Sequence, residues 1–150
     1  MAQNKKSHPQ NWQVPEYDTQ FWAGKTQAYC IVIPVINEGA RLHRLLNSMV
    51  ELEIDKIADI IIVDGGSQDG SLELDILKEA HVAGLLLKKG AGKLSAQLRC
   101  AYAFALEKGY EGIVTIDGNN KDDPQAIPEF IAQLQQGVDF VQASRFIKGG

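Results

Sequence analysis

Short, continuous hydrophobic runs alternate with amphipathic runs from residue 28 onward. The hydrophobic runs predict strands at residues 28–35, 57–63, 84–88, 112–117 and 138–143. Apolar and polar positions do not alternate within these runs, as expected for strands that helices cover on both faces. The amphipathic runs predict helices at residues 40–52, 70–80, 93–108 and 125–136.

Two of the predicted helices carry a single apolar stripe at i, i+3, i+4 and i+7. The first stripe consists of Leu42, Leu45, Leu46 and Met49, and the second of Ile127, Phe130, Ile131 and Leu134. This spacing is typical of helices that pack one face on a sheet. Strands that alternate with helices imply right-handed parallel crossovers. The predicted fold class is therefore α/β, with a doubly wound, mostly parallel sheet.

The first 27 residues differ from the rest because they are polar, with scattered aromatic rings at Trp12, Tyr17, Phe21 and Trp22. We interpret residues 1–27 as an extended N-terminal arm whose rings pack on the domain. A chain of 150 residues is about the size of one domain. Residues 28–150 are therefore predicted to form a single domain.

Composition excludes several classes of protein. The net charge of −4, without a basic stripe, argues against a nucleic-acid partner. No apolar run approaches the roughly 18 residues of a membrane helix. The opening MAQNKKSHPQNW lacks the apolar core of a signal peptide, which predicts a cytoplasmic chain and still allows peripheral membrane contact. Cys30 and Cys100 lack metal-ligand spacing and are predicted to be buried, reduced thiols.

Polar loops follow three of the predicted strands at their carboxyl ends. They are Ile36-Asn37-Glu38, the loop from Asp64 to Ser71, and the loop from Asp117 to Pro124. In an open α/β sheet, ligands bind in the crevice beyond the carboxyl ends of the strands. Three acidic loops at one sheet edge predict a site for a polar ligand that brings a divalent cation.

The same loops resemble the motifs of family 2 glycosyltransferases. IPVINE is similar to an IPVYNE-type opening, VDGGSQDGS to VDDGSxDGS, and DGNNKDDP to the DxD segment of enzymes of the dolichyl-phosphate mannose synthase type. The terminal SRFIKGG resembles a later SRYxxGG stretch. The resemblance covers about residues 28–150, and the order and spacing of the motifs agree. It implies the Rossmann-like GT-A fold and a nucleoside-diphosphate-sugar ligand, with the sugar, base and acceptor unspecified.

The resemblance and the chemistry of the residues together predict substrate-binding residues at the strand ends and in the third helix, although the match to the family around Arg99 is poor. They are Pro34, Asn37, Glu38, Asp64, Gly65, Gly92, Lys93, Arg99, Asp117 and Gly118. The DxD-like segment implies Mg²⁺ or Mn²⁺ held by Asp117 and Asn119, because hard cations prefer oxygen ligands shared with substrate phosphates. Asn119 replaces an acid, so metal affinity is expected to be reduced. In the motif after Asp64, Gly65 stands where the family usually has a second acid.

Simpler roles remain open for several of these residues. Asn37 could cap the helix that follows it, and Asp69 could cap the next one. Gly90-Ala91-Gly92-Lys93 does not match a Walker or Rossmann fingerprint, although a glycine-rich turn before a helix can bind an anion. Arg99 could lie on a solvated helix face.

The expected activity is metal-assisted transfer of a sugar to an acceptor, with a polyprenyl phosphate or a saccharide as candidates. The resemblance implies that the acceptor half and the catalytic base lie beyond residue 150, so the chain is expected to be C-terminally truncated. We expect it to bind a sugar nucleotide, transfer sugar poorly, and self-associate through an unpaired sheet edge. The alternatives are a non-catalytic nucleotide-sugar-binding module and, less favoured, a sugar nucleotidyltransferase.

Overall fold

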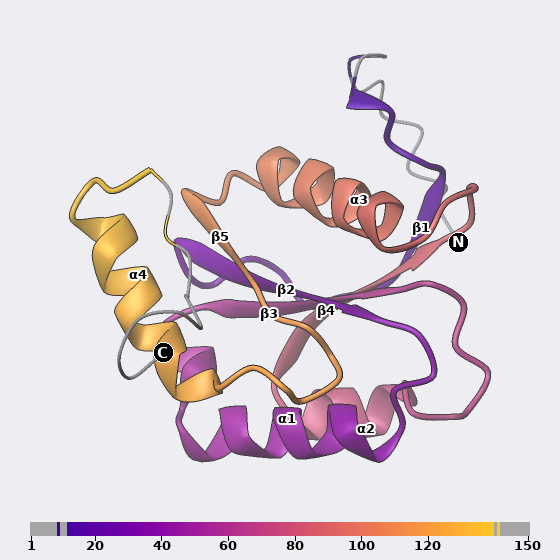
Figure 1. Ribbon diagram of the computed structural model, residues 1–150, viewed down its shortest axis with the longest axis horizontal. Helices are drawn as coiled ribbons and strands as arrows, with labels where there is room; N and C mark the ends of the chain where they lie inside the picture. The colour runs from indigo at the N-terminus through magenta and orange to yellow at the C-terminus, as the bar shows by residue number, and fades with distance from the viewer. Residues whose placement is uncertain (1–8, 10–11, 140, 142–150) are drawn as a thin grey trace.

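A computed structural model of the chain describes residue 9, residues 12–139 and residue 141. Its centre is a five-stranded sheet with the strand order β1-β4-β3-β2-β5 (Figure 1). The strands are β1 (Tyr17–Trp22), β2 (Tyr29–Val35), β3 (Asp59–Asp64), β4 (Val82–Lys88) and β5 (Gly112–Thr115). The helices are α1 (Ala40–Glu51), α2 (Leu74–Glu79), α3 (Leu94–Glu107) and α4 (Ile127–Gln135), with short 3-10 turns η2 (Ile54–Lys56) and η3 (Pro124–Ala126).

Helices cover both faces of the sheet, which confirms the predicted doubly wound α/β fold. Helix α3 lies on one face, and α1, α2 and α4 lie on the other (Figure 1). Every residue of β2 and β3 is buried, so the continuous apolar runs follow directly from coverage on both sides. Each fully buried Ile or Leu of this core stabilises the fold by about 1.5–3 kcal/mol. The predicted thiols Cys30 and Cys100 are both buried and free.

The strand β1 is a difference from the sequence interpretation, which placed these residues in an arm outside the domain. It pairs antiparallel with β4, from Tyr17 opposite Lys88 to Trp22 opposite Gly84. The packing of rings is confirmed, because Trp22 meets Phe104 of α3 edge to face, with ring centroids 4.9 Å apart. The N-terminal segment is thus an edge strand of the sheet.

Two other elements differ most from their predicted bounds. Helix α2 begins at Leu74 instead of residue 70, because the preceding residues form tight turns. Of the predicted strand 138–143, the described residues Val138, Asp139 and Val141 are not in a strand. The remainder of that strand and the SRFIKGG motif lie outside the described residues.

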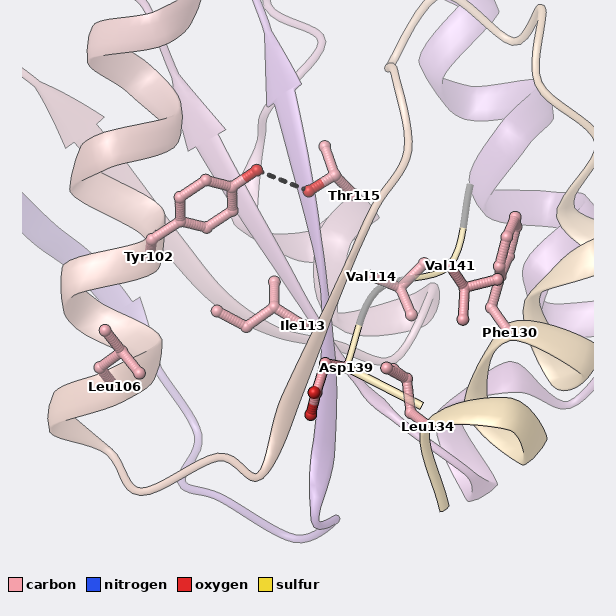
Figure 2. A pocket seen from close by; sticks show the side chains of 9 residues that line it. All are labelled: Tyr102, Leu106, Ile113, Val114, Thr115, Phe130, Leu134, Asp139 and Val141. Carbon is pink, nitrogen blue, oxygen red and sulfur yellow. Dashed lines mark hydrogen bonds between the residues drawn. The ribbon is translucent and has the colours of Figure 1, made fainter. Parts of the chain in front are cut away.

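Within the described part of the chain, β5 is therefore an outer strand. A hollow of about 540 Å³ lies beside it (Figure 2). Side chains of α3 and α4 flank this hollow, and Tyr102 bonds Thr115 across its rim at 2.9 Å between the two oxygens. Over the same part of the chain, no helix has the combined length and apolarity needed to cross a membrane.

A buried polar network ties the amino ends of the strands together. Asp59, the first residue of β3, is only 4% exposed. Its carboxylate accepts hydrogen bonds from Thr26 N (2.8 Å), Thr26 Oγ1 (2.6 Å), Gln27 N (3.2 Å) and Tyr110 Oη (2.6 Å). Burial, and then this hydrogen bond to Asp59, raise the pKa of Tyr110. The network anchors the end of the sheet opposite to the predicted site.

Candidate functional site

The candidate site is the sheet edge at which β2, β3, β4 and β5 end. These strands are mutually parallel, so their carboxyl ends meet on one side of the molecule. Most of the predicted site residues lie at these strand ends or in the loops that follow them, and Gln97 and Gly118 bring neighbouring loops into contact. The structure therefore gathers three of the four motifs at one edge, as the strand pattern predicted, while SRFIKGG lies outside the described residues.

Asp64 organises the loop that follows β3. Its Oδ1 accepts hydrogen bonds from Gly66 N (3.0 Å), Ser67 N (2.8 Å) and Ser67 Oγ (2.7 Å). The residue is 6% exposed, and Oδ2 accepts no hydrogen bond from the described residues. One carboxylate oxygen thus shapes the loop, while the other remains available as an acceptor.

Asn37 joins two of the loops and does not cap a helix. Its side-chain Oδ1 accepts a hydrogen bond from Gln68 N at 2.8 Å, and its backbone N–H donates to Ser67 Oγ at 2.9 Å. Helix α1 instead has Gly39 at its N-cap, without a side-chain hydrogen bond. The positive φ of Asn37, 47°, turns the chain sharply at the end of β2. Its side-chain oxygen is therefore engaged with the neighbouring loop.

Pro34, Glu38 and Gly118 lie together where the loop after β5 crosses the end of β2. A Cβ on Gly118 would lie 3.1 Å from Pro34 O and 3.5 Å from Glu38 Cγ, so the backbones approach closely. The pairing of β2 with β5 ends at Val32, before Pro34 is reached. The missing N–H of Pro34 therefore removes no hydrogen bond from the sheet. Glu38 forms an ion pair with Arg41 at 3.1 Å.

Asp69 closes a turn ahead of α2. Its Oδ1 accepts hydrogen bonds from Ser71 Oγ at 2.6 Å and Ser71 N at 3.1 Å, whereas the N-cap of α2 is Glu73. The hydrogen bonds from Ser71 lower the pKa of the Asp69 carboxyl. The alternative role as a helix cap is therefore wrong, and the carboxylate stabilises the loop instead.

Gly65 has a different role from the turn that its sequence suggests. The positive φ values of this loop belong to Gly66 (115°) and Gly70 (74°). A Cβ on Gly65 would instead meet the side-chain amide of Gln97 at 3.1 Å. Gln97, a buried residue of α3, was not predicted as a site residue.

The loop before α3 is pinned from the N-terminal side. Lys89 N and Gly90 N donate to Glu16 O at 2.8 and 2.9 Å, and Lys89 Nζ forms an ion pair with Asp18 at 2.6 Å. This contact with Asp18 raises the pKa of Lys89. The loop and β1 are thus held as one unit.

Lys93, at the N-cap of α3, has an exposed side chain, and no side chain of the described residues caps the first amides of the helix. Gly92 has a φ of 110°, and a Cβ there would lie 2.5 Å from Ala96 Cβ, so the turn requires glycine. The Arg99 side chain donates to Gln13 O at 3.0 Å and to Ser95 Oγ at 3.3 Å. The structure therefore brings Gly92 and Lys93 to the start of α3, whereas Arg99 binds the N-terminal segment.

The DxD-like loop is held by its own polar side chains. Asp117 N donates to Asp122 Oδ2 at 3.1 Å, Asn119 N to Asp117 Oδ1 at 3.4 Å, and Lys121 N to Asn119 Oδ1 at 3.0 Å. No group of three or more His, Cys, Asp and Glu side chains is arranged around a common metal position in the described residues. Mg²⁺ commonly takes one or two carboxylates together with substrate phosphates. The carboxylates of Asp117 and Asp122 provide a donor set of that kind.

A pocket of about 440 Å³ lies beside Asp64, between its loop and the edge of the sheet. Its lining includes Gln20, Leu72 and Leu87 as well as residues of the loop. Gln20 lies at the β-bulge of β1, between the pairs formed by Thr19 and Phe21, and bulges re-aim side chains. Gln20 was not among the predicted site residues, because residues 1–27 were interpreted as an N-terminal arm.

Residues 30–150 match the family model described as glycosyl transferase family 2. The chain is 33% identical over 122 residues to an undecaprenyl-phosphate 4-deoxy-4-formamido-L-arabinose transferase of Aeromonas hydrophila, an alignment that covers 77% of this chain and 36% of the relative. Proteins of the same name from Shewanella sediminis and Proteus mirabilis are each 30% identical, over 77% and 81% of this chain and 35% and 38% of the relatives.

The chain thus spans somewhat more than a third of the length of these relatives. The matched range contains all four loops at the carboxyl edge of the sheet, together with the strands that support them. The chain belongs to glycosyl transferase family 2.

Proposed function

We propose that this chain is the nucleotide-sugar-binding part of a glycosyltransferase that transfers a sugar from a nucleoside diphosphate to a polyprenyl phosphate. The observation that carries the proposal is the convergence of the Asp64, Lys93 and Asp117 loops at one parallel sheet edge. The polyprenyl-phosphate acceptor is suggested by the names of the relatives, which are undecaprenyl-phosphate 4-deoxy-4-formamido-L-arabinose transferases.

Asp64 is proposed to recognise the nucleotide base. Its Oδ1 is engaged with its own loop, so Oδ2 would accept a hydrogen bond from a base N–H. Uracil and guanine present such an N–H, next to a carbonyl. The pocket of about 440 Å³ beside Asp64 falls in the size range of small-ligand sites.

Lys93 and the free amides at the start of α3 are proposed to bind the diphosphate. The N-terminus of a helix of this length attracts anions, because unpaired N–H groups and the helix dipole point toward the ligand. The pinned Lys89-Gly90 segment holds this turn in place before ligand arrives. Electrostatic preorganisation of this kind lowers the cost of orienting a charged ligand.

Asp117 and Asp122, with the Asn119 amide oxygen, would hold Mg²⁺ or Mn²⁺ beside the diphosphate. A bound cation offsets the negative charge that develops on the departing nucleoside diphosphate. The chain's own residues orient the donor and exclude part of the solvent from it. None of the described residues is proposed to activate the acceptor.

The test is calorimetric titration of the 150-residue chain with UDP, GDP, dTDP and ADP, with Mn²⁺ and with chelator. We expect one uracil-, thymine- or guanine-containing diphosphate to bind preferentially, and the cation to strengthen its binding. Asp64→Asn retains the loop-forming oxygen, whereas Asp64→Ala removes three hydrogen bonds as well. If Asp64 reads the base, both variants lose affinity while Asp64→Asn keeps its stability. Equal affinity of Asp64→Asn and wild type for every nucleotide would refute that role.

Transfer activity is tested separately, with radiolabelled sugar nucleotides and undecaprenyl phosphate in detergent. Binding without turnover would favour the alternative of a non-catalytic binding module. Turnover by the chain alone would show that it contains the acceptor-activating group.

A further inference from the structure

Gln97 is a buried polar residue in the first turn of α3, and only 5% of it is exposed. Its Nε2 donates to Val35 O at 2.9 Å and to Val63 O at 3.1 Å. These carbonyls belong to the last residue of β2 and the penultimate residue of β3. One side-chain amide therefore bridges the carboxyl ends of two neighbouring strands.

The same amide supports the backbone of the loop after β3. A Cβ on Gly65 would lie 3.1 Å from both Cδ and Nε2 of Gln97, so the chain passes directly over the amide plane. Gly65 N in turn donates to Val35 O at 2.9 Å, the carbonyl that also accepts from Gln97. Strand end, loop and helix thus share one buried hydrogen-bonded junction.

A second connection between the loops lies at the surface. It consists of the bonds of Asn37 with Gln68 N and Ser67 Oγ, at 2.8 and 2.9 Å. Water competes with these exposed bonds, whereas the bonds of Gln97 are shielded and are stronger in a low dielectric. The buried junction therefore fixes the spacing of the loops, and the surface contact follows it.

We propose that Gln97 is the positioning residue of the donor site: it sets the distance between the loop 36–38 and the loop 64–71. Through that spacing it holds Asp64 where the nucleotide base binds, without contacting the sugar or diphosphate itself. This inference rests on the proposed nucleotide-binding function for its effect on affinity. Its effect on loop order does not depend on any ligand.

An apolar replacement of similar length would break the junction and keep its volume. Gln97→Met leaves Val63 O without the Gln97 donor and removes the support below Gly65. Apparent affinity falls in proportion to the population of the binding-competent loop arrangement. We expect about a tenfold loss of nucleotide affinity, which corresponds to a competent population reduced to about one tenth.

Two readouts test the proposal on the folded chain. Calorimetry measures affinity for whichever nucleoside diphosphate wild type binds best, and hydrogen exchange measures protection of the Gly65 and Gln68 amides. Gln97→Met should lose affinity and protection together. Tyr110→Phe removes a buried hydrogen bond at the opposite end of the sheet and should change neither. An equal loss of affinity in this control would attribute the effect to general stability and overturn the proposal.

Gly65→Ala perturbs the same junction without changing Gln97, because its methyl group would displace the Gln97 side-chain amide. It should reproduce both changes in smaller degree, and it decides the question if Gln97→Met does not fold. Wild-type affinity and exchange in the folded variants would overturn the role of Gln97. Absence of nucleotide binding by wild type would instead overturn the proposed function, while exchange at Gly65 and Gln68 still tests the junction.

Discussion

Replacing Asp59 with alanine should remove a large part of the stability of this domain. Asp59 is 4% exposed and accepts four hydrogen bonds, from Thr26, Gln27 and Tyr110. Asp59→Ala removes these bonds and leaves the buried Tyr110 hydroxyl without this acceptor. A hydrogen bond to a charged group contributes about 1.5–3 kcal/mol, and an unsatisfied buried donor costs about 1–3 kcal/mol.

The lost hydrogen bonds and the unsatisfied donor are partly the same effect, because Tyr110 is counted in both. Removal of the buried Asp59 charge offsets part of the lost free energy. The expected net decrease in the free energy of unfolding is therefore about 3–4 kcal/mol. Domains of this kind are stable by only about 5–15 kcal/mol. With a urea m-value near 2 kcal/mol per molar, the midpoint of unfolding should fall by about 1.5–2 M.

Equilibrium urea unfolding, followed by circular dichroism, measures this shift. A double-mutant cycle with Tyr110→Phe isolates the contact of Asp59 with Tyr110, and we expect a coupling energy of about 1–2 kcal/mol. Nucleotide affinity of the folded variants should not change, because the network lies at the amino ends of the strands. A midpoint equal to that of wild type, or strictly additive mutations, would refute the assigned role of the network.

Alkaline pH should destabilise the fold, because burial raises the pKa of Cys30 to about 12 and of Cys100 to about 11, from an ordinary 9.0. The contribution of the two neutral thiols to the free energy of unfolding is complete below about pH 9 and is lost as the pH rises toward their folded-state pKa values. Urea midpoints that stay constant between about pH 7.5 and 10.5, measured in reductant, would contradict this expectation. Gly118→Ala should lower the free energy of unfolding by about 1–3 kcal/mol and weaken nucleotide binding, because its Cβ would lie 2.7 Å from Cγ1 of Val35 at the end of β2. Urea denaturation measures the stability and calorimetry the affinity, and wild-type values of both would contradict the close approach. Asn119→Asp should tighten Mn²⁺-dependent nucleotide binding, because it adds a carboxylate to those of Asp117 and Asp122. Calorimetry with Mn²⁺ and with chelator measures the change, and an unchanged metal response would argue against a cation in this loop.

The sequence alone determined the elements whose patterns are local. The stripe of Leu42, Leu45, Leu46 and Met49 repeats with the period of a helix, and α1 spans Ala40–Glu51 with all four residues buried. The continuous apolar runs predicted β2 and β3, because strands covered on both faces have no polar positions. The placement of the acidic loops at one edge also followed, since parallel strands end on the same side.

Tertiary structure decided the elements whose partners are distant in the chain. The segment Tyr17–Trp22 has a mixed polar sequence, and only pairing with β4 makes it a strand. The start of α2 moved to Leu74 because Asp69 and Ser71 form a side-chain turn that competes with the helix. These outcomes depend on pairing and on side-chain hydrogen bonds, which hydrophobic periodicity does not encode.

The roles of individual site residues were also decided in three dimensions. The motif marked Asp64 as important, but only the hydrogen bonds of its loop show that Oδ1 is engaged there while Oδ2 accepts none from the described residues. Arg99 was predicted at the site, and only the structure shows that its side chain donates to the backbone of Gln13. Gln97 has no local signal, because its hydrogen-bond partners lie 62 and 34 residues away. Sequence determines which loops approach the crevice, whereas packing determines which side chains hold them there.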